Sequence, residues 1–200
     1  DRGFIERLID RAKAAKGSAL VLTMDLQILG QRHKDLRNGL SAPPKFRPQH
    51  MWQVGTRPLW ALQMLGTKRR TFRNIQGHIT GAGDIGSLAN WTNSQFDPTL
   101  SWRDVEWVKK RFGGTVIVKG VLDPDDAKSA IAHGADGVIV SNHGGRQLDG
   151  APSPIRVLPD IVEAVGRQTQ VFMDSGVRSG QDVLKAVALG AKGVFIGRAL

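Results

Sequence analysis

A histidine and an arginine lie three residues apart in SNHGGRQLDG at residues 141–150, directly after the apolar run at residues 137–140. The imidazole of His143 can gain or lose a proton near neutral pH. The guanidinium of Arg146 offers a planar fork of donors that matches a carboxylate or a phosphate. The two glycines between them allow unusual backbone angles and the close approach of a ligand. This pattern predicts a reactive loop after a buried strand; the alternative is a surface loop with incidental polar residues.

Other residues that could take part in chemistry lie at the ends of further apolar runs. These runs are at residues 18–24, 115–118, 170–173 and 193–196, and the residues at their ends are Thr23, Asp25, Lys119, Asp174, Arg178 and Arg198. The carboxyl ends of parallel strands lie on one side of a sheet, so we expect these residues to converge with His143 and Arg146. The turns that precede the runs at 137–140 and 193–196 are short, GAD and GAK. Residues that could take part in chemistry thus follow the apolar runs, whereas the turns before these two runs are short. This difference between the two ends of the strands favours a functional site at one end of the sheet.

The elements that must position these residues alternate regularly along the chain. Apolar residues at helical spacing predict helices over residues 4–15, 101–112, 124–133, 155–165 and 181–189, and a proline in a first turn predicts a short helix over 58–66. Repeated strand–helix units imply a parallel sheet, and continuous apolar runs imply strands that are buried on both faces. The fold class is therefore α/β. A partial (β/α)8 barrel fits best, and a doubly wound open sheet is the alternative.

Loops with glycine and one arginine follow the last two runs: Gly176 with Arg178, and Gly197 with Arg198. Backbone N–H groups of such loops often bind phosphate in barrel enzymes. Two consecutive loops predict a cofactor or substrate that carries a phosphate; the alternative is that each arginine pairs with a carboxylate. A lysine such as Lys119 is costly to bury without an anion, so we expect it to contact a flavin or a phosphorylated substrate, unless it reaches solvent past the barrel rim.

The net charge of +10 is concentrated in one segment. Between residues 32 and 73, Asp35 is the one acidic residue among ten basic residues: Arg32, Lys34, Arg37, Lys45, Arg47, Arg57, Lys68, Arg69, Arg70 and Arg73. This block predicts an acidic partner, either anionic lipid or nucleic acid; the alternative is a solvated basic surface. The chain has no cysteine, which excludes a disulfide framework and a thiolate metal site, and we predict no metal site. No apolar run approaches the ~18 residues of a membrane-spanning helix.

Residues 1–200 are interpreted as a single partial barrel domain with a long irregular insertion at about 41–99. Residues 26–40 before it are polar and basic and are predicted to form a loop. A connection as long as the insertion at about 41–99 is uncommon in a compact domain and is usually functional or disordered. Because residue 1 is Asp rather than Met and the chain stops after its fifth apolar run, we expect a piece of a longer protein.

Six motifs resemble the C-terminal part of the catalytic domain of the FMN-dependent α-hydroxy acid dehydrogenases and oxidases. They are LTMD at residues 22–25, GQR at 30–32, VKG at 118–120, SNHGGRQLDG at 141–150, DSGVR at 174–178 and IGR at 196–198. The ten-residue motif is highly specific, and the order of the others agrees with it. The resemblance implies a (β/α)8 barrel of which roughly strands 4 to 8 are present. The family's substrate-binding tyrosine is missing, since the chain has no tyrosine.

The resemblance also implies a role for each candidate residue. His143 would be the base that removes a proton from a 2-hydroxy acid, Asp25 would hydrogen-bond it, and Arg146 would bind the substrate carboxylate. Arg32 resembles the family's second arginine near the substrate. Lys119 would stabilise negative charge on the reduced flavin. The remaining FMN contacts would come from Thr23, Ser141, Asp174, Gly176, Arg178, Gly197 and Arg198.

These roles imply FMN-dependent oxidation of an L-2-hydroxy acid, with L-lactate as the first candidate, to the 2-oxo acid. Electrons would pass to a quinone, a cytochrome or oxygen. The resemblance also implies a homo-oligomer, a tetramer in the family, and no nucleic-acid partner. In membrane-associated members the segment after strand 4 binds the membrane, and residues 45–73 have the composition of an interfacial anchor. We therefore expect a cytoplasmic protein that can lie on the inner face of the plasma membrane; the alternative is a loop that covers the substrate.

Two other functions stay open. The first is another flavin- or phosphate-binding barrel enzyme, which is less favoured because such an enzyme would not require His143, Arg146 and Asp25 together. A basic module that binds nucleic acid or membrane would explain the charge, but not the site residues at the strand ends. We expect the 200 residues by themselves to be inactive, since the missing strands would leave open edges on the sheet.

Overall fold

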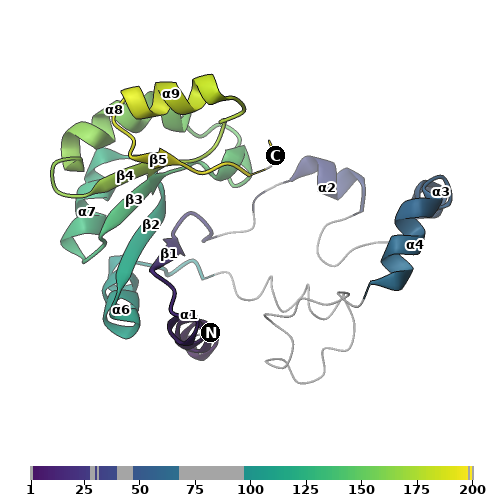
Figure 1. Cartoon of the computed structure of the whole chain (residues 1–200), viewed down its shortest axis with the longest axis horizontal. Coiled ribbons are helices and arrows are strands. Elements are labelled where there is room, and N and C mark those ends of the chain that lie inside the picture. The colour runs from purple at the N-terminus through teal and green to yellow at the C-terminus, as the bar shows by residue number, and fades with distance from the viewer. Residues whose placement is uncertain are drawn as a thin grey trace. The chain divides into compact units, whose positions relative to one another are not determined.

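The computed structural model describes residues 2–27, 30, 32–39, 47–67, 97–197 and 199. The chain divides into two compact units, residues 1–31 with 97–200, and residues 32–96. The first unit is an α/β structure, and the second is helical where it is described (Figure 1). The prediction of a single domain is not tested by this division, and we describe each unit separately.

A five-stranded sheet forms the centre of the first unit. Its strands are β1 (Ala19–Thr23), β2 (Thr115–Val121), β3 (Gly137–Val140), β4 (Gln170–Met173) and β5 (Gly193–Val194). Neighbouring strands are parallel and follow the sequence order β1-β2-β3-β4-β5. A doubly wound sheet would reverse its strand order at a switch point, and this sheet does not. The unit is therefore a partial (β/α)8 barrel, as predicted.

The helices of this unit lie along the outer side of the sheet (Figure 1). They are α1 (Arg2–Ala14), α6 (Trp102–Phe112), α7 (Pro124–Ala132), α8 (Pro154–Val165) and α9 (Gly180–Ala188). Each agrees within two residues with a helix predicted from apolar spacing. Because every helix returns the chain to the same end of the sheet, all strands run in one direction and their carboxyl ends share one rim.

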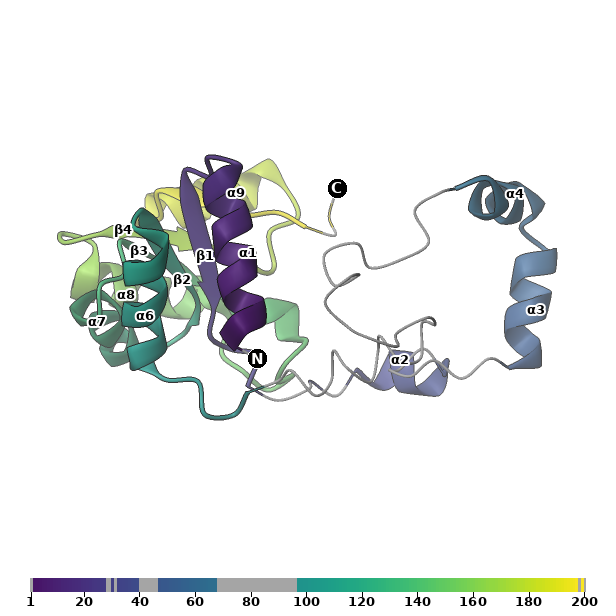
Figure 2. The same cartoon turned by 90° about the horizontal axis from the view of Figure 1, so that it is seen from below.

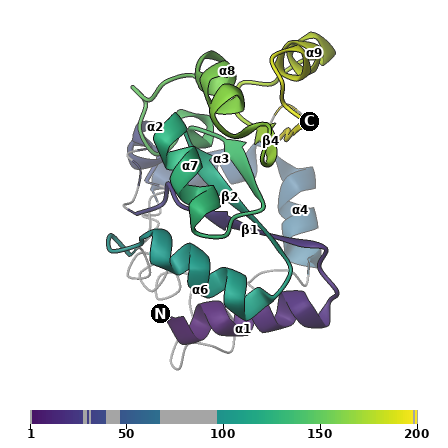
Figure 3. The same ribbon diagram turned by 90° about the vertical axis from the view of Figure 1, so that its left-hand side faces the viewer.

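Helices α1 and α6 lie side by side (Figures 2 and 3). Two ion pairs join them, Arg2–Asp104 at 2.7 Å and Arg111–Asp10 at 2.6 Å. Exposed pairs of this kind stabilise a protein by at most about 1 kcal/mol each. The larger contribution comes from a buried apolar cluster under the two helices, made of Ile9, Val108, Phe112 and Val116.

The main core lies between the sheet and helices α7 and α8. All four residues of β3 are buried, as its continuous apolar run predicts. Val118 and Val138 on the sheet and Leu158 and Ile161 on α8 have no exposed surface. Burying one such side chain stabilises the fold by about 1.5–3 kcal/mol. This core gives the strand ends a rigid support.

The ends of two strands differ from the sequence predictions by two residues or more. β2 continues through Lys119 to Val121, so the lysine lies inside the strand rather than at its end. Gly120 has a φ of +102°, and the pairing register with β3 shifts between Lys119 and Val121. A shift of this kind cannot be read from apolar runs. β5 is shorter than predicted and ends at Val194.

The second unit contains α2 (His33–Arg37), α3 (Pro48–Gly55) and α4 (Pro58–Gly66) where it is described. α4 confirms the predicted helix. The predictions of a loop over 33–37 and of irregular structure over 48–55 were wrong. α2 is too short to show a periodic pattern. The first turn of α3 is capped by a histidine: the backbone N–H of Arg47 donates to Nδ1 of His50 at 3.0 Å. Residues 41–46 and 68–96 of the predicted insertion lie outside the described residues.

Candidate active site

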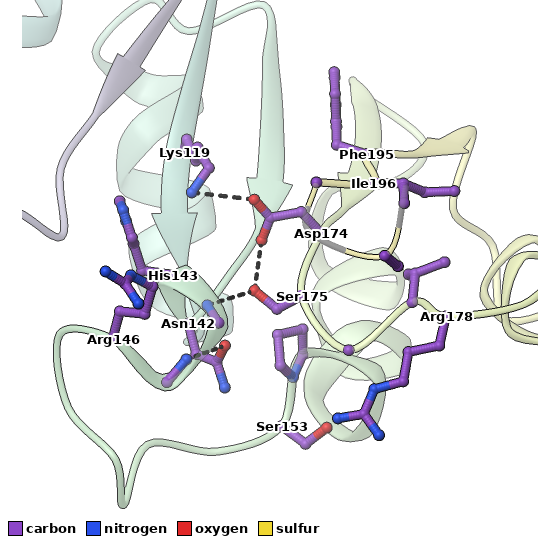
Figure 4. Close-up of a pocket in the computed structure, with 17 residues that line it drawn as sticks. Lys119, Asn142, His143, Arg146, Ser153, Asp174, Ser175, Arg178, Phe195 and Ile196 are labelled. Atoms are coloured by element: carbon purple, nitrogen blue, oxygen red, sulfur yellow. Dashed lines mark hydrogen bonds and ion pairs between the residues drawn. The ribbon is translucent and has the colours of Figure 1, made fainter. Parts of the chain in front are cut away.

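A cavity of ≈ 1000 Å³ opens at the carboxyl ends of strands β2 to β5 (Figure 4). Seven of the predicted site residues line it: Lys119, His143, Arg146, Asp174, Gly176, Arg178 and Gly197. The apolar side chains of Phe195 and Ile196 line it as well. The predicted convergence at one rim of the sheet is thus present.

His143 is held by a carboxylate from another strand end. Its Nδ1 lies 3.1 Å and 3.3 Å from the two carboxylate oxygens of Asp25, which follows β1. The two side chains are mostly buried, with 26% and 16% of their surface exposed. The carboxylate accepts a hydrogen bond from Nδ1–H, which leaves Nε2 as the nitrogen that can accept a proton. This pair is suited to general base catalysis.

The turn that carries His143, residues 143–146, is here named the base turn. Its first three residues have φ values of +58°, +69° and +68°. The last two of these are glycines, for which this conformation has little cost. The Asn142 side chain fixes the turn, because it accepts a hydrogen bond from the Gly145 N–H at 3.2 Å and donates one to the Pro152 carbonyl at 3.2 Å.

Two glycines outside the turn allow close packing around the base. A Cβ atom at Gly120 would lie 2.8 Å from Cβ and Cγ of Asp25. A Cβ atom at Gly30 would overlap the carbonyl oxygen of Arg146. The carboxylate and the base turn therefore have the positions seen only because these two residues have no side chain.

Lys119 and Asp174 form an ion pair on the wall of the cavity. Lys119 Nζ lies 3.1 Å from the Asp174 carboxylate, and it donates to Oγ of Ser141 at 2.9 Å. Ser141 is a fully buried polar residue and does not line the cavity itself. Thr23, the last residue of β1, is paired with Lys119 in the sheet and is not among the residues that line the cavity.

Residues 174–178, here named the phosphate loop, line the cavity next to the base turn, with Ser175 close to it and Arg178 farther away (Figure 4). Ser175 and Gly176 have φ values of +73° and +79°. The Asp182 carboxylate accepts the backbone N–H groups of Arg178 and Ser179 at 3.0 Å and 3.1 Å. These bonds and the Ser179 hydroxyl hold the pKa of Asp182 below its ordinary value.

The phosphate loop and its surroundings fit a phosphate ester. Within the described part of the chain, the Arg178 side chain makes no hydrogen bond or ion pair, although it faces the cavity. The loop also precedes the N-terminus of α9, where backbone N–H groups and the helix dipole favour an anion. The cavity thus combines an anion site with the Lys119–Asp174 pair, and it is large enough for an aromatic ring system beside them.

The structure does not place two of the predicted residues in the site. Arg32 belongs to the second unit, which we describe separately from the cavity. Arg198 lies outside the described residues. Sequence reasoning gave no role to Asn142 or Ser175, although both bond the base turn. Asparagine and serine are too common in loops for their presence within the motifs at 141–150 and 174–178 to indicate such roles by itself.

The sequence pattern of the FMN-dependent dehydrogenase family matches residues 1–200. The chain belongs to this family. FMN is the family's cofactor, as predicted from the motifs. The L-lactate dehydrogenase of Pseudomonas syringae pv. syringae (strain B728a) is 45% identical over 202 residues, which cover all of this chain and 53% of that protein. The chain spans about half the length of the curated relatives it matches.

Solved structures confirm the fold assignment. The monotopic membrane protein (S)-mandelate dehydrogenase superposes with a TM-score of 0.91 at 34% identity, covering 100% of this chain and 52% of that one. A soluble mutant of the membrane-associated (S)-mandelate dehydrogenase from Pseudomonas putida gives a TM-score of 0.76 at 34% identity, over 100% and 49% of the two chains. The structure therefore corresponds to about half of a flavin-dependent barrel enzyme.

Proposed function

We propose that the full-length protein oxidises an L-2-hydroxy acid, with L-lactate as the first candidate, to the 2-oxo acid with FMN as cofactor. The observation that carries this proposal is the pairing of His143 with Asp25, since the base turn that holds His143 also holds Arg146 at the same cavity as the phosphate loop. The name of the relative that is 45% identical supports lactate as the substrate.

The residues of the base turn bind and deprotonate the substrate in this proposal. Arg146 binds the substrate carboxylate through paired hydrogen bonds. His143 takes a proton from the substrate on Nε2, and the Asp25 carboxylate stabilises the imidazolium that forms. Arg32 is proposed as a second arginine near the substrate.

The remaining site residues bind the cofactor. FMN, when bound, supplies the acceptor of the two electrons that leave the substrate. Lys119 places a positive charge beside the flavin ring, and Asp174 accepts hydrogen bonds from ribityl hydroxyls. The phosphate is bound by the loops after the last two strands, and the full proposed set of FMN contacts is Thr23, Lys119, Ser141, Asp174, Gly176, Arg178, Gly197 and Arg198.

A substrate panel on the full-length protein tests this function. L-lactate, mandelate and glycolate are assayed with oxygen and with a quinone analogue as acceptors, and the flavin is measured by absorbance. We expect a bound flavin and turnover of at least one acid. A protein without flavin, or with flavin but without turnover of any 2-hydroxy acid, would contradict the proposal and favour another phosphate-binding barrel enzyme. The faster acceptor decides between a dehydrogenase and an oxidase.

We also propose that residues 45–73 bring the protein to an anionic membrane surface. Helices α3 and α4 contain no buried residue. Met51 and Trp52 are 75% exposed, and Leu59 and Leu65 are 70% exposed. Apolar side chains flanked by arginine and lysine are typical of helices that lie in the membrane interface. No helix within the described ranges is long and apolar enough to cross a bilayer.

Sedimentation of the full-length protein with vesicles tests this second proposal. We expect binding to vesicles that contain phosphatidylglycerol, weaker binding as salt is added, and loss of binding in a Trp52→Ser, Leu62→Ser double variant. Leu184→Ser is the control, because Leu184 is also 70% exposed but lies on α9 in the first unit. Equal binding of the double variant and the wild type would contradict the proposal. We also propose, from the resemblance to the family alone, that the protein lies at the inner face of the plasma membrane and that it is a homo-oligomer.

A further inference from the structure

The base turn and the phosphate loop are joined directly by one hydroxyl group. The backbone N–H of Gly144 donates to Oγ of Ser175 at 2.9 Å. The same Oγ donates to the Asp174 carboxylate at 2.8 Å (Figure 4). The other carboxylate oxygen of Asp174 pairs with Lys119 at 3.1 Å. Ser175 therefore connects the backbone beside the base to the ion pair on the cavity wall.

The connection continues from Lys119 back to the base turn and forms a closed circuit. Lys119 Nζ donates to the buried Ser141 hydroxyl at 2.9 Å. The backbone N–H of His143 donates to the same hydroxyl at 3.0 Å. Two consecutive N–H groups of the base turn are thus held by two serine hydroxyls, and the Lys119–Asp174 pair links those hydroxyls.

Two residues of this circuit that are not glycine have a costly backbone conformation. Ser175 and His143 have φ values of +73° and +58°, although neither is a glycine. Such conformations are unfavourable for residues with a side chain and persist only when the surroundings determine them. A glycine would adopt the φ of Ser175 at lower cost but would lack the hydroxyl that joins the two loops.

We propose that Ser175 is a positioning residue that couples cofactor binding to substrate binding. The inference rests on the proposed function, in which the phosphate loop binds FMN and the base turn binds the substrate carboxylate. A ligand that orders one loop then lowers the cost of ordering the other, because the Ser175 hydroxyl bonds both. Each ligand must therefore raise the affinity of the other by the same factor.

The experiment measures this coupling factor in the full-length protein. The Kd of FMN is measured by flavin fluorescence, with and without saturating pyruvate as the carboxylate probe. We expect pyruvate to tighten FMN binding in the wild type, and Ser175→Gly to reduce that factor about fivefold, the value of one hydrogen bond of ordinary strength. Because glycine tolerates the φ of residue 175, this variant is expected to fold. Ser175→Ala, which keeps the unfavourable backbone φ of +73° and removes only the hydroxyl, is expected to show the same loss.

Thr169→Val is the matched control. The Thr169 hydroxyl donates to the Asp136 carbonyl, so it also joins two turns, but at the opposite end of the sheet. This variant is expected to lower stability without changing the coupling factor. The inference is overturned if Ser175→Gly keeps the wild-type factor, or if Thr169→Val loses as much. A wild type that binds no flavin or oxidises no 2-hydroxy acid would instead overturn the proposed function.

Discussion

At the residue scale, the Asp25 carboxylate determines what His143 can do. It lies within 3.3 Å of Nδ1 through both of its oxygens, and 16% of its surface is exposed. A buried carboxylate in this position selects the tautomer with the proton on Nδ1 and stabilises the charged ring. The structure thus accounts for both the orientation of the base and the charge that it acquires during the proposed reaction.

Asp25→Asn keeps the size of this side chain and removes its charge. We expect kcat with the best 2-hydroxy acid to fall about 10²-fold or more, because a general base contributes about 10²–10⁴-fold and the amide can favour the wrong tautomer. Steady-state kinetics of the full-length variant, with its flavin content measured in parallel, check this. A kcat within twofold of the wild type would show that the pair has no catalytic role.

Gly120→Ala tests the close approach of Asp25 to β2. The new Cβ would lie 2.8 Å from two atoms of Asp25, and the φ of +102° would be strained for alanine. We expect loss of about 1 kcal/mol or more in the free energy of unfolding, and a lower kcat because the carboxylate is displaced. Urea unfolding and steady-state kinetics measure the two effects. Gly180→Ala is the control, since its Cβ would have no neighbour within 4 Å; equal behaviour of the two variants would contradict the account.

At the element scale, Asp136 ties together the ends of the sheet opposite the site. It lies in the turn between α7 and β3, and its carboxylate accepts from Lys109 of α6 at 2.6 Å and from the Val116 N–H of β2 at 2.7 Å. Burial of this carboxyl opposes ionisation, but the bonds from Lys109 and Val116 outweigh it and hold the pKa of Asp136 below its ordinary value of 3.8. The ionised form is therefore favoured by folding.

This lowered pKa has a definite sign in the pH dependence of stability. The stabilisation from Asp136 is complete above its ordinary pKa of 3.8 and is lost as the pH falls through the lower pKa of the folded protein. Because the side chain is 39% exposed, we expect Asp136→Asn to cost less than about 1 kcal/mol near neutral pH. Urea unfolding from about pH 7 to about pH 3 should show the difference from the wild type shrinking. A difference that grows toward acid pH would contradict this assignment.

The elements of the first unit were predictable because each strand is a continuous apolar run and each helix has a periodic apolar face. α2 and α3 were missed, since α2 is five residues long and α3 begins after Arg47, whose backbone N–H is bound by the His50 side chain rather than by a common capping residue. The position of the site was predictable, because the residues that follow parallel strands converge at one rim of the sheet. The role of Ser175 was not, because its hydroxyl acts on Gly144, which is 31 residues away.

At the scale of the whole molecule, the chain provides one part of a barrel. Its five strands include β1 and β5 at the two outer positions of the sheet, and the curated relatives are about twice as long. His143, Arg146 and residues 174–178, to which the proposed function assigns the base, the carboxylate-binding arginine and the anion site, nevertheless all line one cavity in the described part of the first unit. The proposed chemistry can therefore be assigned to this part, while its activity must be measured on the full-length protein.

The rate of flavin reduction without oxygen tests the central claim, which is that His143 is the base of a 2-hydroxy acid oxidation. The full-length wild type and His143→Gln are each mixed anaerobically with L-lactate, or with the best acid of the panel, and flavin absorbance is followed. We predict that the variant keeps its flavin and is reduced about 10²–10⁴-fold more slowly. Reduction of the variant at the wild-type rate would contradict the assignment of His143.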